Sequence, residues 1–395
     1  MAGVDDKARL HLERSVPQLR EWEERGIFSK DEIRNIVKKR DDYEHRVLNP
    51  SNRPADWASY IQWEKSLEAL RAKRCKRLKI NQHLSSNISS QGRILQLYDR
   101  GVNRHPGSAP LWHEYLAYLA QVKASKRFRN TMTNALRMMP TNVDLWVLAG
   151  RKSADSGDMA AARGFFLRGC RFCNKDAGLW IEYARCEMDW LLKMQQEQKN
   201  KKPHSMEKSD AQNELSLVGL SDDEEGEEDG VLMPKPDADA PQVVDSQSAQ
   251  QLLSSPAMDG AIPIAVFDVC RKQPFFTSAT AASFFDIFTA YRALTVQPRI
   301  TAHVLSAMDE QYPNDPYTCD SHVREPLIAL NPSTAEFPRK LKVVLATLKQ
   351  KMQCTTDKEV LKGLSLKWID GYLEAELDEA IRTVLEATKK QVLAS

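Results

Sequence analysis

The side chains most concentrated for one kind of chemistry in this chain are basic. Within a 395-residue chain whose formal net charge is only +2, nine consecutive residues hold six cations, namely Arg71, Lys73, Arg74, Lys76, Arg77 and Lys79. Lys and Arg at this density can bind RNA phosphates or an acidic partner. The same residues can equally be the solvated end of a helix, where cations interact favourably with the helix dipole. Both interpretations stay open from the sequence alone.

Two further groupings resemble reactive sites without completing one. Asp320, Ser321 and His322 are the residue types of a hydrolase triad, but they are contiguous, whereas a triad is assembled from distant parts of a fold. Cys170 and Cys173 form a lone CxxC pair, and a structural zinc site needs further ligands. Phosphate-binding loops, HExxH helices and nucleophile elbows are missing. We therefore expect no catalytic residue, no cofactor and no metal, and an enzyme is the disfavoured class.

Composition favours a soluble intracellular protein. Hydrophobic residues make up 42% of the chain, enough for a buried core, and the 28% that are charged nearly balance in sign. Seven cysteines, an odd number, do not indicate a disulfide framework and fit a reducing compartment. Apolar runs are too short to cross a membrane, and the N-terminus lacks a signal-peptide core. We expect neither membrane binding nor a small-molecule substrate.

The elements that carry these residues follow a repeated signature between residues 109 and 190. Trp112, Trp146 and Trp180 each follow a leucine and are 34 residues apart. A period of this length, with helix breakers such as Pro106 and Pro140 between the units, is typical of stacked helix pairs. The sequence therefore predicts an all-α fold, an α-solenoid of helix pairs similar to those of tetratricopeptide (TPR) repeats.

Aromatic residues at helical spacing are expected to form the core of these repeats rather than a ligand site. The repeat core is predicted to contain Trp57, Tyr60, Trp63, Trp112, Tyr115, Tyr118, Trp146, Trp180 and Tyr183. Second helices are predicted at residues 126–139 and 159–173, with Asp158 as an N-cap. Small residues on these helices, Gly169 among them, are expected to let the tryptophans pack closely.

Residues 1–50 are predicted to form an αα-hairpin. Its first helix is expected to end at Gly26, because glycine readily adopts the left-handed conformation of a helix terminus. Residues 29–32 have the pattern of a capping box, and Phe28 and Ile33 stand where a hydrophobic staple would close. The second helix should therefore begin directly after Ser29.

A repeat array is predicted for residues 51–202 and a disordered linker for residues 203–260. The linker is rich in Ser, Asp, Glu, Gln and Pro and cannot bury enough apolar surface to offset its conformational entropy. Its residues 222–229 form an acidic block that is either a solvating linker or a flexible contact for basic partners. Ser221, with this acidic flank, is a candidate phosphorylation site for an acidophilic kinase.

Residues 261–395 are predicted to form a second, degenerate array of helical repeats. The apolar periodicity predicts helical segments at residues 264–272, 281–294, 300–311, 337–354 and 357–389. Residues 312–332 contain four prolines and are expected to be irregular. Trp368 and Tyr372, four residues apart, are a candidate last aromatic pair.

These motifs resemble a known family. One pattern resembles the half-a-TPR (HAT) repeat: a Trp, a Tyr three residues later and then an aromatic residue or Glu, followed by a second helix and a boundary proline. HAT repeats occur almost entirely in RNA-processing proteins. Residues 24–29 (ERGIFS) and 60–64 (YIQWE) more specifically resemble the family of the sixth U3 small nucleolar RNA-associated proteins. The resemblance covers roughly the first 190 residues.

The resemblance implies a non-catalytic scaffold subunit of the small-subunit processome, in its UTP-B subcomplex, acting in pre-18S rRNA processing and early 40S ribosome assembly. It implies WD40 β-propeller subunits of that subcomplex as partners. It also implies that the chain contacts the U3 small nucleolar RNA particle and pre-rRNA largely through other subunits of the assembly. The implied location is the nucleolus, within the nucleus. The alternative is a HAT-repeat scaffold in splicing or mRNA 3′-end processing.

Overall fold

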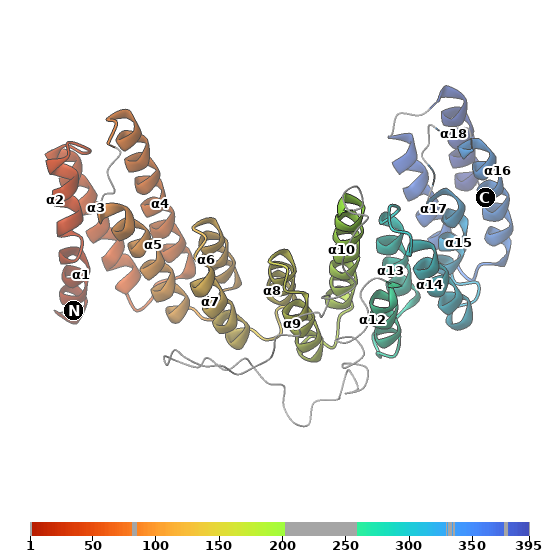
Figure 1. Ribbon diagram of the computed structural model, residues 1–395, viewed down its shortest axis with the longest axis horizontal. Coiled ribbons are helices and arrows are strands. Elements are labelled where there is room, and N and C mark those ends of the chain that lie inside the picture. The colour runs from red at the N-terminus through yellow and green to blue at the C-terminus, as the bar shows by residue number, and fades with distance from the viewer. Residues whose placement is uncertain are drawn as a thin grey trace, which may run out of the picture. The chain divides into compact units, whose positions relative to one another are not determined.

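The computed structural model of the chain describes residues 2–80, 85–201, 259–328, 330, 334, 336–374 and 378–394. Across these ranges the chain forms seventeen helices and no strand, so the all-α prediction is confirmed. None of these helices is both long and apolar enough to span a membrane. The helices divide into two compact units (Figure 1): α1–α7 belong to unit 1, and α8–α10 with α12–α18 belong to unit 2.

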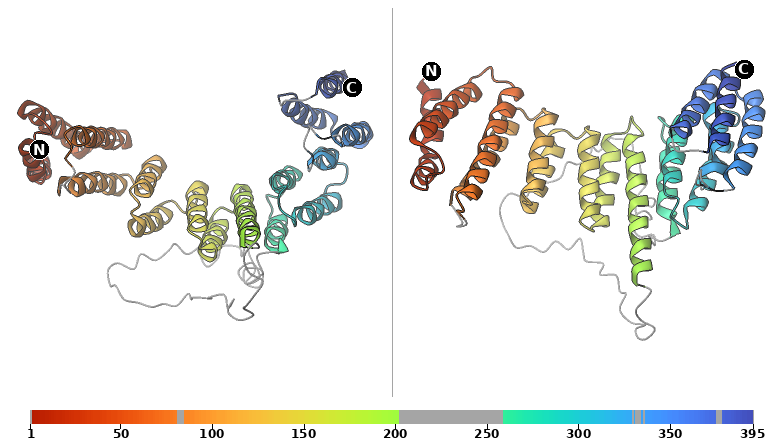
Figure 2. Two further views of the ribbon diagram at one scale, coloured as in Figure 1. Left: turned by 45° about the horizontal axis from the view of Figure 1, so that its top comes forward. Right: turned by 90° about the horizontal axis from the view of Figure 1, so that it is seen from above.

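Unit 1 is a stack of helices in which each packs on helices close to it in the chain. Its helices are α1 (Ala2–Glu13), α2 (Val16–Glu24), α3 (Lys30–Leu48), α4 (Pro54–Arg77), α5 (Ser85–Arg104), α6 (Ala109–Gln121) and α7 (Ser125–Met138). The most extensive contacts join α1 to α3, α4 to α5 and α6 to α7, and α2 reaches both α3 and α5 (Figure 2). This is the side-by-side packing expected of helical repeats.

The first 26 residues differ from the single helix expected there. They form α1 and α2, which are separated at Arg14 and Ser15. Pro17 explains the break, because proline has no backbone N–H to continue a helix but suits the first turn of a new one. Gly26 closes α2 with a φ of 65°, as predicted.

The predicted start of α3 is confirmed atom by atom. The Ser29 N–H donates to Glu32 Oε2 at 2.9 Å, and the Glu32 N–H donates to Ser29 Oγ at 3.3 Å. Both bonds of the capping box therefore satisfy amide groups that the helix itself leaves unpaired. Phe28 and Ile33 lie in the same apolar cluster, together with Trp22.

Unit 2 contains the remaining described helices. They are α8 (Val143–Asp155), α9 (Met159–Phe172), α10 (Gly178–Lys201), α12 (Ala261–Arg271), α13 (Ser278–Ala290), α14 (Gln297–Gln311), α15 (Pro316–Ile328), α16 (Phe337–Cys354), α17 (Lys358–Leu373) and α18 (Glu379–Ala394). Asp158 caps α9, as expected, because its Oδ1 accepts a hydrogen bond from the Ala161 N–H at 2.9 Å.

Helices from both sides of the expected linker pack together in unit 2. α10 contacts α12 and α13, and the Tyr291 hydroxyl donates to Asp189 Oδ1 of α10 at 2.6 Å. Gln195 of α10 donates to the Ala293 carbonyl at 2.8 Å and accepts from the Thr295 N–H at 3.2 Å. The linker itself, with its acidic block and Ser221, lies outside the described residues except for its last two positions.

One prediction for the C-terminal region was wrong. Residues 312–332, expected to be irregular, contain α15, with Pro316 as its first residue and Pro326 inside it. Proline at the first helical position costs no hydrogen bond, whereas Pro326 removes one backbone hydrogen bond, which lies in the last turn of the helix. Cys319, Val323 and Leu327 recur four residues apart and are all buried, and their burial outweighs that loss.

The other predicted C-terminal helices are present. The helix expected at residues 337–354 coincides with α16, and the helical stretch at 357–389 consists of α17 and α18. Trp368 and Tyr372 do form a pair, with ring centroids 6.2 Å apart, and both pack on the cluster that contains Phe337.

One packing pair recurs along the chain at a constant spacing of seventeen residues. The rings of Tyr43 and Tyr60 stack at 5.0 Å, those of Tyr98 and Tyr115 at 4.9 Å, and those of Phe166 and Tyr183 at 5.0 Å. Phe267 and Phe284 have the same spacing and meet edge to face at 5.4 Å. This shared spacing places the helices after residue 260 in the same repeat pattern as those before residue 201.

A buried ion pair recurs in the same register. Arg40 donates to both carboxylate oxygens of Glu64 at 2.8 and 3.0 Å, and Arg163 does so to Glu187 at 2.7 and 3.0 Å. The partners are 24 residues apart in both pairs. In the repeat that contains Tyr98 and Tyr115, the equivalent positions are Leu95 and Leu119. The repeat therefore accommodates either a bidentate ion pair or two leucines at this place.

The nine residues of the predicted repeat core are internal. Eight of them are buried, and Trp63 is half-buried. Trp146 stacks on Phe172 at 5.8 Å, and a Cβ at Gly169 would lie 2.8 Å from its ring. Only glycine therefore fits at position 169 without displacing the tryptophan.

Candidate RNA and partner interface

The basic segment, residues 71–79, lies at the C-terminal end of α4. Two of its six cations are paired with carboxylates. Arg71 is buried and donates to both carboxylate oxygens of Glu68, at 2.8 and 2.6 Å. Arg74 donates to both oxygens of Glu32 at 2.8 and 2.7 Å and lies over the Phe28 ring. These two arginines are therefore structural groups that join neighbouring side chains, and they are not available as free cations.

The ion pair with Arg74 lowers the pKa of its partner, Glu32. Hydrogen bonds from Arg74 and from the Ser29 N–H lower the pKa of Glu32 to about 2. The Glu32 carboxylate thus caps α3 and holds the end of α4 at the same time. The basic segment is anchored to α3 through this one residue.

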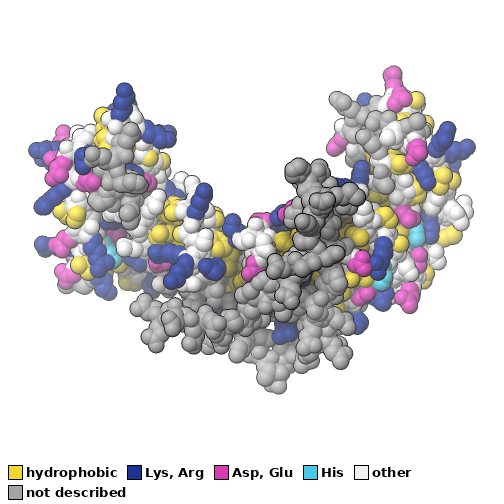
Figure 3. Space-filling model, viewed as in Figure 1, with side chains coloured by type: hydrophobic (Ala, Val, Ile, Leu, Met, Phe, Trp, Pro, Cys, Tyr) yellow, Lys and Arg dark blue, Asp and Glu magenta, His cyan; other side chains and the backbone are white. Residues whose placement is uncertain are grey.

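Four cations of the segment remain exposed. Lys73, Lys76, Arg77 and Lys79 form no ion pair with any residue that the structure describes. Figure 3 shows Lys and Arg side chains gathered at this end of unit 1. They surround the helix terminus whose dipole favours positive charge, and they are free to contact an external anion.

The three contiguous residues that resemble a triad have separate partners. The Ser321 hydroxyl donates to the Tyr317 carbonyl at 2.9 Å, and His322 Nε2 pairs with Asp309 at 2.7 Å. Asp320 pairs with Arg324 at 2.7 Å. A nucleophile needs a base within hydrogen-bond reach and a third group orienting that base, and these three side chains do not provide that arrangement.

The burial of Asp320 nevertheless makes the free energy of unfolding depend on pH. Burial raises the pKa of Asp320 from 3.8 to about 6, against the opposing charge of Arg324. The folded chain therefore holds this proton more tightly than the unfolded chain, so the stability from protonated Asp320 is present below about pH 4 and is lost as the pH rises through 6.

We expect Asp320→Asn to remove this dependence. Relative to the wild-type chain, the variant's free energy of unfolding should rise by about 2 kcal/mol between pH 4 and pH 7. Urea unfolding at the two pH values measures the difference, and hydrogen exchange of α15 amides localises it. A constant difference between the two proteins would show that Asp320 is charged throughout this range.

The CxxC cysteines are packing residues. Cys170 and Cys173 are buried, and burial raises the pKa of Cys173 to about 11 and that of Cys170 well above its usual value. The thiolate that would bind a metal or act as a nucleophile is thus disfavoured at both. Among the described residues, no three or more His, Cys, Asp or Glu side chains are grouped so that they could hold a metal ion.

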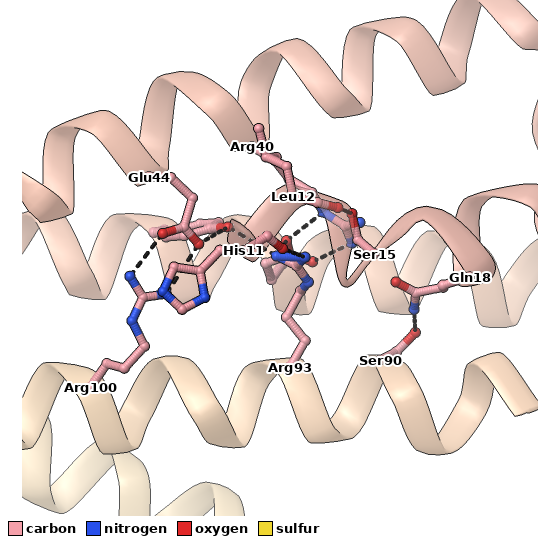
Figure 4. Close-up of polar contacts among 11 residues, drawn as sticks. His11, Leu12, Ser15, Gln18, Arg40, Glu44, Ser90, Arg93 and Arg100 are labelled. Carbon is pink, nitrogen blue, oxygen red and sulfur yellow. Dashed lines mark hydrogen bonds and ion pairs between the residues drawn. The ribbon is translucent and has the colours of Figure 1, made fainter. Parts of the chain in front are cut away.

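A polar cavity in unit 1 was not foreseen from the sequence. Its volume is about 180 Å³, and it lies between α1, α2, α3 and α5. Figure 4 shows Arg93 and Arg100 extending from α5 toward Glu44 of α3 and His11 of α1. Arg100 donates to both Glu44 oxygens at 3.1 and 2.8 Å, and Arg93 donates to the His11 carbonyl at 3.0 Å. The one available sequence signal is the pair of arginines seven residues apart on one helix face.

Known proteins resemble the N-terminal part of this chain. Residues 12–95 match the family model described as U3 small nucleolar RNA-associated protein 6. The protein of that name from Schizosaccharomyces pombe is 34% identical over 191 residues, which are 48% of this chain and 39% of that protein. The homologues from Mus musculus and Homo sapiens are 25% and 26% identical over about half of this chain and 34% and 33% of their own lengths.

These comparisons confirm the family resemblance found in the sequence, and the family model places it at residues 12–95. The match covers well under two thirds of each relative's length. The names of the relatives describe association with an RNA and not a reaction.

Proposed function

We propose, on the premise that this chain is related to U3 small nucleolar RNA-associated protein 6 through residues 12–95, that the chain is a non-catalytic scaffold subunit of the small-subunit processome. Its role is in pre-18S rRNA processing and early 40S ribosome assembly, within the nucleolus. The observation that carries the proposal is the family match over residues 12–95 together with 34% identity over 191 residues to the fission yeast protein.

The position of the match supports this role. Residues 12–95 cover α2, α3 and α4 completely, together with the first half of α5. The exposed basic end of α4 lies within this range. Stacked helix pairs offer extended side-chain surfaces to partners and few concave reaction sites. A scaffold that contacts protein and RNA partners through such surfaces agrees with both observations.

We propose two contact regions in unit 1. The exposed cations Lys73, Lys76, Arg77 and Lys79 would contact RNA phosphate within the U3 particle. Leu10, Val16 and Val37 are exposed on α1, α2 and α3 and would contact a protein subunit. By the resemblance, WD40 propellers of the UTP-B subcomplex are the proposed subunits.

The RNA contact predicts a specific salt dependence. Reversing three exposed charges with Lys73→Glu, Lys76→Glu and Arg77→Glu should weaken binding to pre-rRNA at low salt and make the slope of log K against log salt shallower by about two to three. Filter binding across a salt series measures both quantities.

A matched variant controls for net charge. Lys126, Arg129 and Arg137 of α7 are exposed cations of the same unit and form no ion pair with another described residue. Their reversal to Glu should change the slope little. Equal slopes for the two triple variants would contradict a contact at the end of α4.

Depletion of the chain from cells tests the function itself. We expect 18S rRNA precursors to accumulate while large-subunit rRNA is still produced, and re-expression of the wild-type chain should restore processing. Ser321→Ala should restore it equally, because the Ser321 hydroxyl is bonded to a helix carbonyl and takes no part in a reaction. Accumulation of introns or of uncleaved messenger precursors instead would identify a splicing or 3′-end factor.

A further inference from the structure

The polar cavity of unit 1 contains more positive than negative charge. Its walls and the groups directly behind them include the guanidinium groups of Arg14, Arg40, Arg93 and Arg100 and the carboxylates of Glu44 and Glu64. Arginine stays protonated under all physiological conditions. Four positive and two negative charges therefore leave a surplus of two positive charges around the cavity.

The pairing of these groups shows where the surplus lies. Both oxygens of Glu64 accept hydrogen bonds from Arg40, and both oxygens of Glu44 accept from Arg100. Arg93 is left 4.0 Å from the occupied Glu64, and its hydrogen-bond acceptors among the described residues are neutral oxygens, the His11 carbonyl and the Tyr60 hydroxyl. Arg14 is exposed at the rim and forms no ion pair with a described residue.

We propose that this cavity binds the phosphate of a phosphorylated serine or threonine on a partner protein. A phosphomonoester carries a charge of about −1.5 to −2 at pH 7, which matches the surplus. Its terminal oxygens accept the charge-assisted hydrogen bonds that Arg14 and Arg93 have to offer. Recognition of phosphorylated segments by clustered arginines is a general mode of peptide binding.

The shape and lining of the cavity favour a protein side chain over RNA. An internal RNA phosphate carries a ribose on either side and does not fit a cavity of about 180 Å³ between α1, α2, α3 and α5, whereas a phosphomonoester is a terminal group. A nucleotide with a terminal phosphate would gain most from stacking its base on an aromatic side chain. The described lining residues include no Phe, Tyr or Trp.

His11 provides an internal reporter of the site. Burial and the charge of Arg100 lower its pKa, Arg14 and Arg93 lower it further, and Glu44 opposes them. These groups come from α1, from the α1–α2 turn, from α3 and from α5, the elements packed around the ring. A bound dianion would offset the arginines, so occupancy should raise the pKa of His11.

The test is a titration of the full-length chain followed by NMR of the histidine rings, with four probes: N-acetyl-O-phosphoserine amide, N-acetylserine amide, inorganic phosphate and adenosine 5′-monophosphate. We expect the phosphoserine probe to bind more tightly than inorganic phosphate or the nucleotide and to raise the pKa of His11, and the serine probe to have no effect. Tighter binding of inorganic phosphate or of the nucleotide would overturn the assignment to a protein side chain. No response of His11 to any probe would overturn the site.

Variants locate the binding. Arg14→Gln should weaken binding of the phosphoserine probe about tenfold without unfolding the chain, because the Arg14 side chain is exposed and forms no ion pair with a described residue. Gln96→Glu, which adds a negative charge at the rim, should weaken binding of the phosphoserine probe as well.

Arg20→Gln is the matched control, since Arg20 is an exposed arginine of α2 that does not line the cavity. Equal affinity of Arg14→Gln and Arg20→Gln would contradict binding in this cavity. The test does not depend on the proposed role with U3 RNA.

Discussion

Glu187→Leu should destabilise unit 2 by about 3 to 5 kcal/mol, because it leaves the Arg163 guanidinium buried without its carboxylate. Both hydrogen bonds of the pair, at 2.7 and 3.0 Å, are lost together. Water cannot replace the carboxylate oxygens, since Glu187 is 1% exposed and Arg163 is 7% exposed. Urea unfolding of the full chain, followed by far-ultraviolet circular dichroism and by tryptophan fluorescence, measures the loss.

The double variant Arg163→Leu with Glu187→Leu should recover most of this loss. Replacing both members of a buried ion pair by apolar groups of similar volume is often close to neutral. The chain itself contains the precedent, because Leu95 and Leu119 occupy the equivalent positions of another repeat. We expect the double variant to unfold within about 1.5 kcal/mol of the wild-type chain. A double variant as unstable as the single one would show that the repeats are not equivalent in register.

Trp146→Ala should cost unit 2 a similar amount, about 3 to 5 kcal/mol, because it removes a fully buried indole and leaves a cavity. The ring stacks on Phe172 and, together with Leu179, packs directly over Gly169. Repeats support mainly their neighbours, so hydrogen exchange should increase in α8, α9 and α10 together.

A control substitution separates this effect from the general cost of shortening a side chain. Val343 of α16 is 52% exposed in the same unit, so Val343→Ala should change stability by less than about 0.5 kcal/mol. Unchanged exchange in α8–α10 of Trp146→Ala would contradict the central place of this tryptophan.

The repeats were predictable because their signals are local and strong. The 34-residue spacing of the tryptophans and the capping box at Ser29 are each contained in a short stretch of sequence. α15 was missed because prolines were counted without regard to position. Pro316 begins the helix and Pro326 lies near its end, so neither prevents it. The buried stripe of Cys319, Val323 and Leu327 was the signal that decided the structure.

The candidate sites were less predictable because long-range contacts decide them. The sequence shows the density of cations at residues 71–79, but it does not show that Arg74 reaches Glu32, 42 residues away. The cavity between α1, α2, α3 and α5 joins side chains from residue 11 to residue 100, which only the packing of these helices brings together. Residue types and their spacing within one segment do not show which distant segments will come into contact.

The most direct test of the proposed function is sequencing of the RNA that co-purifies with the tagged full-length chain from growing cells. We expect U3 small nucleolar RNA and precursors of 18S rRNA to be enriched over total RNA, and more weakly with the variant carrying Lys73→Glu, Lys76→Glu and Arg77→Glu. Enrichment of spliceosomal RNA or of messenger precursors, without U3 RNA, would contradict the account.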